Sequence, residues 1–246
     1  MSGGGFPAIL SLITLFLVGG LTGPAAGVIG ALMLTGVLML GTAMTLLTSR
    51  LLSATLLKGT PSSFALELPP YRRPQVGRVI LRSILDRTVR VLGRAVVSAT
   101  PAGLLLWVLA NVSPGGVTLL TRLTGLLDPL GRLLGMDGTI LTGFLLGFPA
   151  NEIVIPIMLM AYTAQGILSG AEGLQLLAVL TENGWTWVTA VCTILFFLMH
   201  WPCATTCLTV FRETRSLKWT AAAFLLPTLC GMLICFVFSG MMSLFL

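Results

Sequence analysis

The sequence predicts an all-α membrane protein that crosses the bilayer several times. Of its 246 residues, 56% are hydrophobic and only 9% are charged, and the mean hydropathy is +1.00. A soluble domain has roughly 25% charged residues. A bilayer core of about 30 Å requires roughly 20 apolar residues per helix, and five or six stretches approach that length. Because lipid offers no hydrogen bonds to the backbone, we expect helices, some of them broken or re-entrant.

We expect three parts along the chain. Residues 1–57 form a transmembrane hairpin, because the apolar run 6–18 is followed by a glycine-rich turn at 19–23 and a second apolar run. Residues 58–94 form a proline-containing linker that ends in a basic interfacial helix. Residues 95–246 form the main transmembrane domain.

Basic residues are concentrated in and beside the predicted linker. The positive-inside rule places this segment in the cytoplasm. We attribute its charge to membrane orientation and to contact with anionic lipid headgroups, and we expect no nucleic-acid partner. The cluster contains nine of the fourteen basic residues, namely Arg50, Lys58, Arg72, Arg73, Arg78, Arg82, Arg87, Arg90 and Arg94.

The order of the apolar runs creates a conflict with the positive-inside rule. The later runs are 95–112, 140–162, 185–208 and 219–238, and the amphipathic stretch 117–134 is too polar to span. If every run crosses once, the basic loop 212–218 lies outside the cell, against the rule. We therefore expect one run to turn back within the membrane. The best candidate is 140–162, because Pro149 and Pro156 divide it into two half-helices.

Two ionisable residues lie inside the apolar runs. Glu152 lies between Pro149 and Pro156, and His200, the only histidine, lies two residues before Pro202. An ionised side chain at mid-bilayer costs about 2.5 to 3.5 kcal/mol on insertion scales, which favours a functional role. We therefore expect both interrupted segments to contribute to the functional site.

Sulfur ligands accompany His200. Cys203 and Cys207 are four residues apart, and Met199 precedes them by one turn on the same predicted helical face. Carboxylate, imidazole, thiolate and thioether together suit a first-row divalent metal such as iron(II) or zinc. Alternatively, the cysteines are small packing residues and Glu152 carries a proton. The candidate metal ligands are Glu152, Asn151, His200, Cys203, Cys207 and Met199.

These stretches resemble successive landmarks of the ferrous-iron transport protein B (FeoB) family. Residues 146–156 are similar to the family's second Gate motif. Four further stretches resemble the family in the same order, namely 55–59, 66–72, 200–203 and 212–219. The resemblance covers nearly the whole chain. It implies iron(II) import across the bacterial inner membrane by a two-Gate permease that is coupled to a cytoplasmic GTP-binding domain.

The same resemblance implies partners for this chain. No Gly-x-x-x-x-Gly-Lys-Ser/Thr loop occurs in the 246 residues, so we expect GTP hydrolysis only from a separate domain or chain. We expect the first Gate motif to be absent as well. A transporter half with a GTP-binding domain, or a second copy of this chain, would then complete the permease. Iron(II) is expected as transported substrate, without a prosthetic group; the alternatives are a nucleoside-like solute or a non-transporting scaffold.

Overall fold

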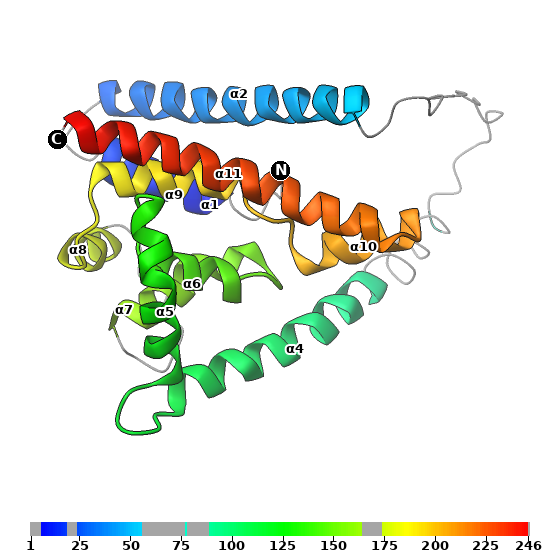
Figure 1. The fold of residues 1–246 in the computed structure, drawn as a ribbon. Coiled ribbons are helices and arrows are strands. Elements are labelled where there is room, and N and C mark those ends of the chain that lie inside the picture. The colour runs from blue at the N-terminus through cyan, green and yellow to red at the C-terminus, as the bar shows by residue number, and fades with distance from the viewer. Residues whose placement is uncertain (1–5, 19–23, 56–76, 78–88, 164–173, 246) are drawn as a thin grey trace.

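The structure, a computed structural model, describes residues 6–18, 24–55, 77, 89–163 and 174–245. The elements in chain order are α1 (Phe6–Leu12), the π-helical η2 (Ile13–Leu17), α2 (Pro24–Thr55), α4 (Val89–Asn111), α5 (Leu119–Leu133), α6 (Gly138–Leu146), the 3-10 helix η4 (Asn151–Ile153), α7 (Val154–Thr163), α8 (Leu174–Glu182), α9 (Trp187–Met199), α10 (Ala204–Thr214) and α11 (Leu217–Phe245). No strand occurs among the described residues, which confirms the all-α prediction. Figure 1 shows α2, α9, α10 and α11 running roughly along one direction.

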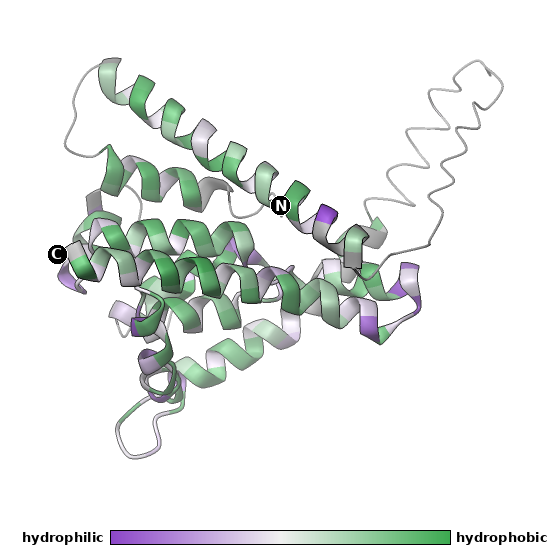
Figure 2. Cartoon of the chain, turned by 45° about the horizontal axis from the view of Figure 1, so that its top comes forward, coloured by the Kyte–Doolittle hydropathy of each residue, from purple (hydrophilic) through white to green (hydrophobic). Residues whose placement is uncertain are grey.

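Long apolar helices make the chain a membrane protein. Judged by length and composition, three stretches of the described residues could cross a bilayer: Ala25–Arg50, Trp187–Thr214 and Leu217–Leu244. Leu32 on α2 and Leu233 on α11 are 65% and 66% exposed. Figure 2 shows apolar residues along the full length of these helices and polar residues near their ends. Such continuous apolar surface suits lipid and would be unusual on a soluble protein.

The first predicted membrane span is a short, buried helix. It continues from α1 into η2, where the backbone N–H of Val18 donates to Ile13 O at 3.1 Å and closes a π-helical turn. Leu12 and Ile13 are fully buried, and both elements contact α9. The helical segment rises only about 18 Å, which is too short for a bilayer core of about 30 Å. This segment therefore forms part of the protein interior.

Helix α4 passes without interruption through the predicted boundary at residue 94. It begins at Val89 and ends at Asn111, with Pro101 inside it. Residues 56–76 and 78–88, which carry most of the predicted basic linker, lie outside the described residues. The division of the chain at residues 57 and 94 therefore stays a prediction.

The amphipathic stretch after α4 forms α5, as predicted. The side chain of Thr118 caps its first turn by accepting a hydrogen bond from Thr121 N at 3.2 Å. In Figure 1, α5 runs across the direction of α9 and α11. It packs closely on α6 because Gly131 of α5 and Gly138 of α6 lie at the contact. A Cβ on Gly131 would lie 2.5 Å from the backbone carbon of Asp137, so only glycine permits this approach.

The segment that follows α5 is a broken hairpin, which confirms the predicted interruption. Helix α6 ends at Leu146, a turn covers 147–150, and η4 leads into α7. The hydroxyl of Tyr162, near the end of α7, donates to the carboxylate of Asp137, which precedes α6. Both ends of the segment therefore lie together, and its tip at 147–150 is at least half-buried, as expected for a re-entrant hairpin.

The C-terminal helices form an antiparallel pair. Helices α9 and α10 run one way, and α11 returns beside both of them. Cys235 on α11 donates its thiol hydrogen to Cys192 O on α9 at 3.4 Å. Gly231 allows α11 to approach α9, because a Cβ there would lie 2.8 Å from Met199 Cβ. All five cysteines are free thiols.

The arrangement of the helices is consistent with one membrane orientation for both basic segments. Figure 1 shows the C-terminal end of α2, the start of α4 and the turn between α10 and α11 at one end of the molecule. Arg50, Arg212 and Lys218 belong to these segments. The positive-inside rule can therefore hold for both basic segments at once, and it predicts that this end faces the cytoplasm.

Cysteines placed at Asn183 and at Glu213 should be labelled from opposite sides of the membrane. Both positions are exposed; Asn183 lies just before the span Trp187–Thr214, and Glu213 lies in the last turn at its other end. A membrane-impermeant maleimide applied to intact cells should label Asn183→Cys, and it should reach Glu213→Cys only after permeabilisation. Peptide mass spectrometry separates these sites from the native cysteines. Labelling of both positions from one side would contradict a full crossing.

Candidate functional site

The two interrupted segments meet inside the protein. The hairpin is interrupted at 147–150, and the span α9–α10 is interrupted at 200–203. The backbone N–H of Ala204 donates to Phe148 O at 2.9 Å, which joins the two interruptions directly. We call these two segments, with Ala204, the break junction. Irregular backbone at membrane depth is tolerated only where it is buried in protein or lines a cavity, so this junction is the candidate site.

Proline explains the break in the α9–α10 span. Pro202 has no N–H to donate, and its ring disfavours helical backbone at Trp201. Helix α9 accordingly ends at Met199, and His200 has extended backbone with a ψ of 171°. Cys203, also extended, is the N-cap residue of α10.

His200 is buried among aromatic rings. His200 is 7% exposed. The ring centroids nearest to its imidazole are those of Phe144 at 5.1 Å, Phe197 at 5.9 Å, Phe196 at 6.2 Å and Trp201 at 6.2 Å. This surrounding excludes water from the imidazole and holds its ring plane in place.

The hydrogen bonding of His200 defines its tautomer. Nδ1 lies 2.9 Å from Phe197 O, and a carbonyl oxygen only accepts, so Nδ1 carries the proton. Nε2 then presents a lone pair, and this buried atom has no hydrogen-bond partner. Histidines that bind metals commonly donate the other ring N–H to a backbone carbonyl in this way. His200 is thus prepared to accept a metal or a hydrogen-bond donor at Nε2.

Cys203 lies close to further polar groups at the start of α10. Its sulfur lies 3.1 Å from Thr205 Oγ1 and 3.2 Å from Thr206 Oγ1. Cys207 donates its thiol hydrogen to Pro202 O at 3.5 Å. The first N–H groups of a helix favour negative charge nearby, so this end of α10 suits a thiolate ligand. A soft sulfur and two hydroxyl oxygens are therefore available at the break junction.

The two predicted ligands on the hairpin point to different environments. Asn151 is 5% exposed, whereas its neighbour Glu152 is exposed. Both belong to η4, directly after the break. The side chain of Glu152 is therefore exposed, although the residue lies within an apolar run of the sequence. A 3-10 helix turns by about a third of a circle per residue, so neighbouring side chains face different directions.

The helical face predicted for Met199, Cys203 and Cys207 does not form. Met199 ends α9 and packs against Gly231, while Cys203 and Cys207 belong to the next helix, beyond the break. Within the described part of the chain, no three His, Cys, Asp or Glu side chains lie close enough to hold one metal ion. The role of the six candidate residues in metal binding stays a prediction.

Sequence reasoning missed a polar network at the base of the hairpin. Tyr162 donates its hydroxyl hydrogen to Asp137, and the same hydroxyl oxygen accepts a hydrogen bond from Trp185 Nε1 at 2.8 Å. We call Asp137, Tyr162 and Trp185 the basal network. Burial raises the pKa of the Asp137 carboxyl, while hydrogen bonds from Tyr162 and from Ile140 N act in the opposite direction. An aspartate just before an apolar run is a typical helix N-cap and could have indicated Asp137.

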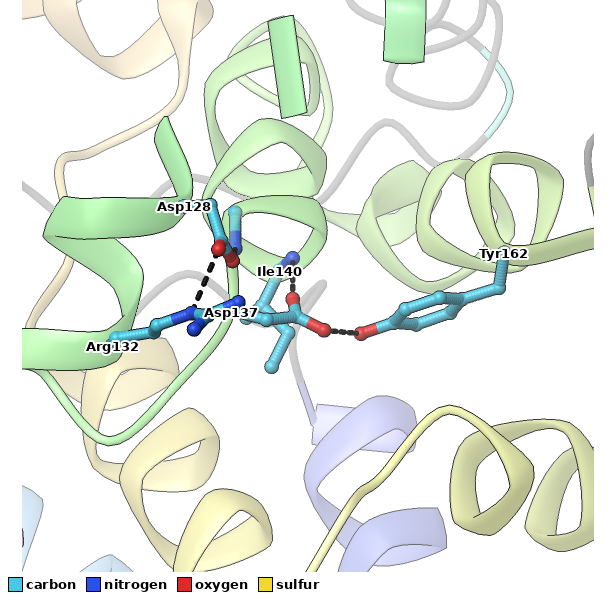
Figure 3. A network of polar contacts seen from close by, with 6 residues as sticks. Asp128, Arg132, Asp137, Ile140 and Tyr162 are labelled. Carbon is cyan, nitrogen blue, oxygen red and sulfur yellow. Dashed lines mark hydrogen bonds and ion pairs between the residues drawn. The ribbon is translucent and has the colours of Figure 1, made fainter. Parts of the chain in front are cut away.

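Figure 3 shows how α5 joins this base. Asp137 accepts a hydrogen bond from Ile140 N at 2.7 Å and thereby caps α6. Asp128 on α5 accepts one from Gly138 N at 3.2 Å and pairs with Arg132 at 2.7 Å. Arg132 is 77% exposed, so its ion pair adds little stability. The hydrogen bond from Gly138 N to Asp128 is a polar contact that links α5 to the hairpin, beside the close packing of the two helices.

A re-entrant hairpin that meets a broken span defines a helical membrane protein of the kind that forms transport pathways. The family model Gate, described as nucleoside recognition, matches residues 92–217, and the model described as ferrous iron transport protein B C terminus matches residues 34–86. Because the Gate match covers just over half of the chain, the chain belongs to the Gate family.

Curated relatives confirm the predicted resemblance to ferrous-iron transport protein B. The Fe(2+) transporter FeoB of Staphylococcus aureus is 29% identical over 223 residues, covering 87% of this chain and 32% of that protein. Its counterpart in Synechocystis is 27% identical over 178 residues (71% and 28%), and that in Leptospira interrogans is 25% identical over 237 residues (87% and 34%). The chain spans about a third of the length of these relatives. No solved structure matches it.

Proposed function

We propose that the chain is the membrane permease part of a ferrous-iron transporter. The break junction is the observation that carries this proposal, since it places a half-buried thiol beside two hydroxyls at the start of α10 and a buried imidazole just before them. Iron(II) is the transported substrate and not a resident cofactor. A transported ion must also be released, so a few weak ligands suit it better than a closed cage.

We assign the iron ligands to the two sides of the break junction. Cys203 and His200 Nε2 serve from the α9–α10 break, and Asn151 and Glu152 supply harder oxygen ligands from the hairpin. Cys207 and Met199 act as further sulfur donors along the path. The exposure of Glu152 fits a pathway between this Gate repeat and another one, because a bare carboxylate facing lipid would be costly.

The partners and location follow from the same proposal. The chain is a multi-pass protein of the bacterial inner membrane, with its basic end in contact with cytoplasmic lipid headgroups. A transporter half that contains a GTP-binding domain, or a second copy of this chain, supplies the second Gate repeat. This chain is not itself the enzyme, since its matches fall on the membrane part of the relatives.

A second candidate function is transport of a nucleoside-like solute, favoured by the description of the Gate family model. In that case Asn151 and Glu152 would hydrogen-bond an organic ligand, and Cys203 would be a packing residue. A non-transporting scaffold would move neither solute. Solute selectivity separates the three functions.

Iron(II) flux into proteoliposomes tests the proposal. We expect the 246-residue chain, alone or with the GTP-binding half of a related transporter, to admit iron(II) anaerobically in preference to manganese(II), zinc(II) and a nucleoside. Glu152→Gln should reduce iron(II) flux about tenfold or more. Losing a charged ligand should weaken ion binding by more than about 1.4 kcal/mol, which corresponds to a factor of ten. Glu182→Gln, an equally conservative change at the exposed end of α8, is the matched control.

Two results would contradict the proposal. Faster entry of the nucleoside than of iron(II) would favour the second candidate function. Absence of flux for every solute, with and without the GTP-binding half, would favour a scaffold.

A further inference from the structure

We propose that Tyr162 is a positioning residue that fixes the α6–α7 hairpin relative to α9. It thereby preserves the hydrogen bond between Ala204 N and Phe148 O at the break junction. Tyr162 acts through the basal network, and it touches neither interruption itself. The inference rests on the proposed function only in treating the break junction as the transport site. The positioning role itself is tested by cysteine modification, which does not require transport.

The Tyr162 hydroxyl connects three elements in one place. It donates to Asp137, the N-cap residue of α6, and it accepts from Trp185, which lies two residues before α9. Tyr162 itself belongs to α7. One hydroxyl group therefore joins the start of α6, the end of α7 and the approach to α9.

The hairpin between this base and its tip is closely packed. A Cβ on Gly143 would lie 2.6 Å from Met158 Cγ, and one on Gly147 would overlap Val154 Cγ2. These glycines let side chains of α7 pack directly against the backbone of α6, so the two helices should move as a single body. A rigid body held at its base has a defined position at its tip.

The tip makes the contact that matters for the site. Phe148 O accepts the hydrogen bond from Ala204 N, the residue directly after Cys203. If the base shifts, this backbone hydrogen bond between the tip and the first turn of α10 is weakened, and the half-buried thiol of Cys203 should become more accessible. The sulfur of Cys203 is then the native probe of the junction.

The buried setting makes the hydroxyl hard to replace. Trp185 is 5% exposed, and the Tyr162 hydroxyl is the acceptor of its indole N–H. One oxygen of Asp137 loses its donor at the same time. Unsatisfied polar groups in a buried place favour rearrangement, so removing one hydroxyl should loosen the base.

Tyr162→Phe removes only this hydroxyl, and Thr163→Val is its matched control. Thr163 donates its hydroxyl hydrogen to Leu159 O within α7, so that substitution breaks no contact between elements. The readout is the rate at which maleimide modifies each cysteine of the full chain in membranes, resolved by peptide mass spectrometry. We expect Cys203 to react about fivefold faster in Tyr162→Phe and at the wild-type rate in Thr163→Val.

Cys192 and Cys235, both fully buried between α9 and α11, report on general unfolding. A rise confined to Cys203 supports positioning. An equal rise at all three cysteines, or no rise at Cys203, would overturn it. If Tyr162→Phe does not accumulate, Trp185→Phe compared with Trp187→Phe repeats the test, since Trp187 is 45% exposed and only Trp185 joins the basal network.

Iron(II) transport is measured separately in the same variants. A higher apparent KM in Tyr162→Phe, together with faster Cys203 modification, supports a role in the proposed permease. Faster Cys203 modification in Tyr162→Phe, with no iron(II) transport by the wild-type chain, would contradict the proposed function and still support the positioning role. An unchanged Cys203 modification rate in Tyr162→Phe, with iron(II) transport by the wild-type chain, would support the proposed function and contradict the positioning role.

Discussion

Replacing Gly138 by alanine should prevent the protein from reaching its folded state, whereas the same change at Gly125 should be tolerated. A Cβ on Gly138 would lie 2.6 Å from Asp128 N and 2.8 Å from Asp128 Cα, and closer still to Thr124 O. All of these atoms belong to the backbone of α5, so no side chain can move aside. The two helices would have to separate, and the hydrogen bond from Gly138 N to Asp128 would be lost.

The expected cost exceeds that of ordinary overpacking. Extra methylene groups in a core cost about 1 to 3 kcal/mol when side chains can rearrange, and here they cannot. A loss of about 4 kcal/mol would take most of the stability of a domain near the lower end of the usual range of about 5 to 15 kcal/mol. Gly138→Ala should therefore be degraded in cells or aggregate when solubilised.

Gly125 provides the comparison. It lies on α5 with open space where its Cβ would be, so alanine there should raise helix propensity by up to about 1 kcal/mol. The measurement is the amount of each variant in membranes and the Tm of the protein in detergent. Equal Tm values for Gly138→Ala and Gly125→Ala would contradict the close approach of α5 and α6.

The interruptions of the helices could be predicted from the sequence because their causes are local. Pro202 ends α9 through its own missing N–H and its effect on the preceding residue. Pro156 was expected to break the hairpin too, yet it lies in the first turn of α7. Proline is compatible with a first turn, since the N–H groups there have no helical partner. Pro156 therefore starts α7 and does not interrupt it.

The basal network could not be predicted because its members are distant in the chain. Tyr162 lies 25 residues from Asp137 and 23 from Trp185, and only the folded hairpin brings them together. The exposure of Glu152 was hidden for a different reason. An apolar stretch indicates membrane depth, but it does not reveal which side of a re-entrant hairpin faces the rest of the protein.

Replacing Cys203 by serine should reduce iron(II) flux about tenfold or more without weakening the fold. Serine keeps the size of the side chain and can hydrogen-bond Thr205 and Thr206 as the thiol does. Position 203 is the N-cap of α10, where serine is among the preferred residues, so α10 should be at least as stable. The variant therefore changes the ligand chemistry and little else. The loss of flux is expected because a hydroxyl is a harder and weaker ligand than a thiolate for iron(II).

Selectivity gives this variant its sharpest test. Manganese(II) prefers oxygen ligands more strongly than iron(II) does, so Cys203→Ser should lower manganese(II) flux less and shift the ratio of the two fluxes. Cys230→Ser, an equal change at a partly buried position on α11, should leave both fluxes near wild type. Proportional losses for both metals would mean that Cys203 shapes the path without binding the ion. Wild-type flux would make it a packing residue, and the case for a sulfur-containing iron site would then have to rest on Cys207 and Met199.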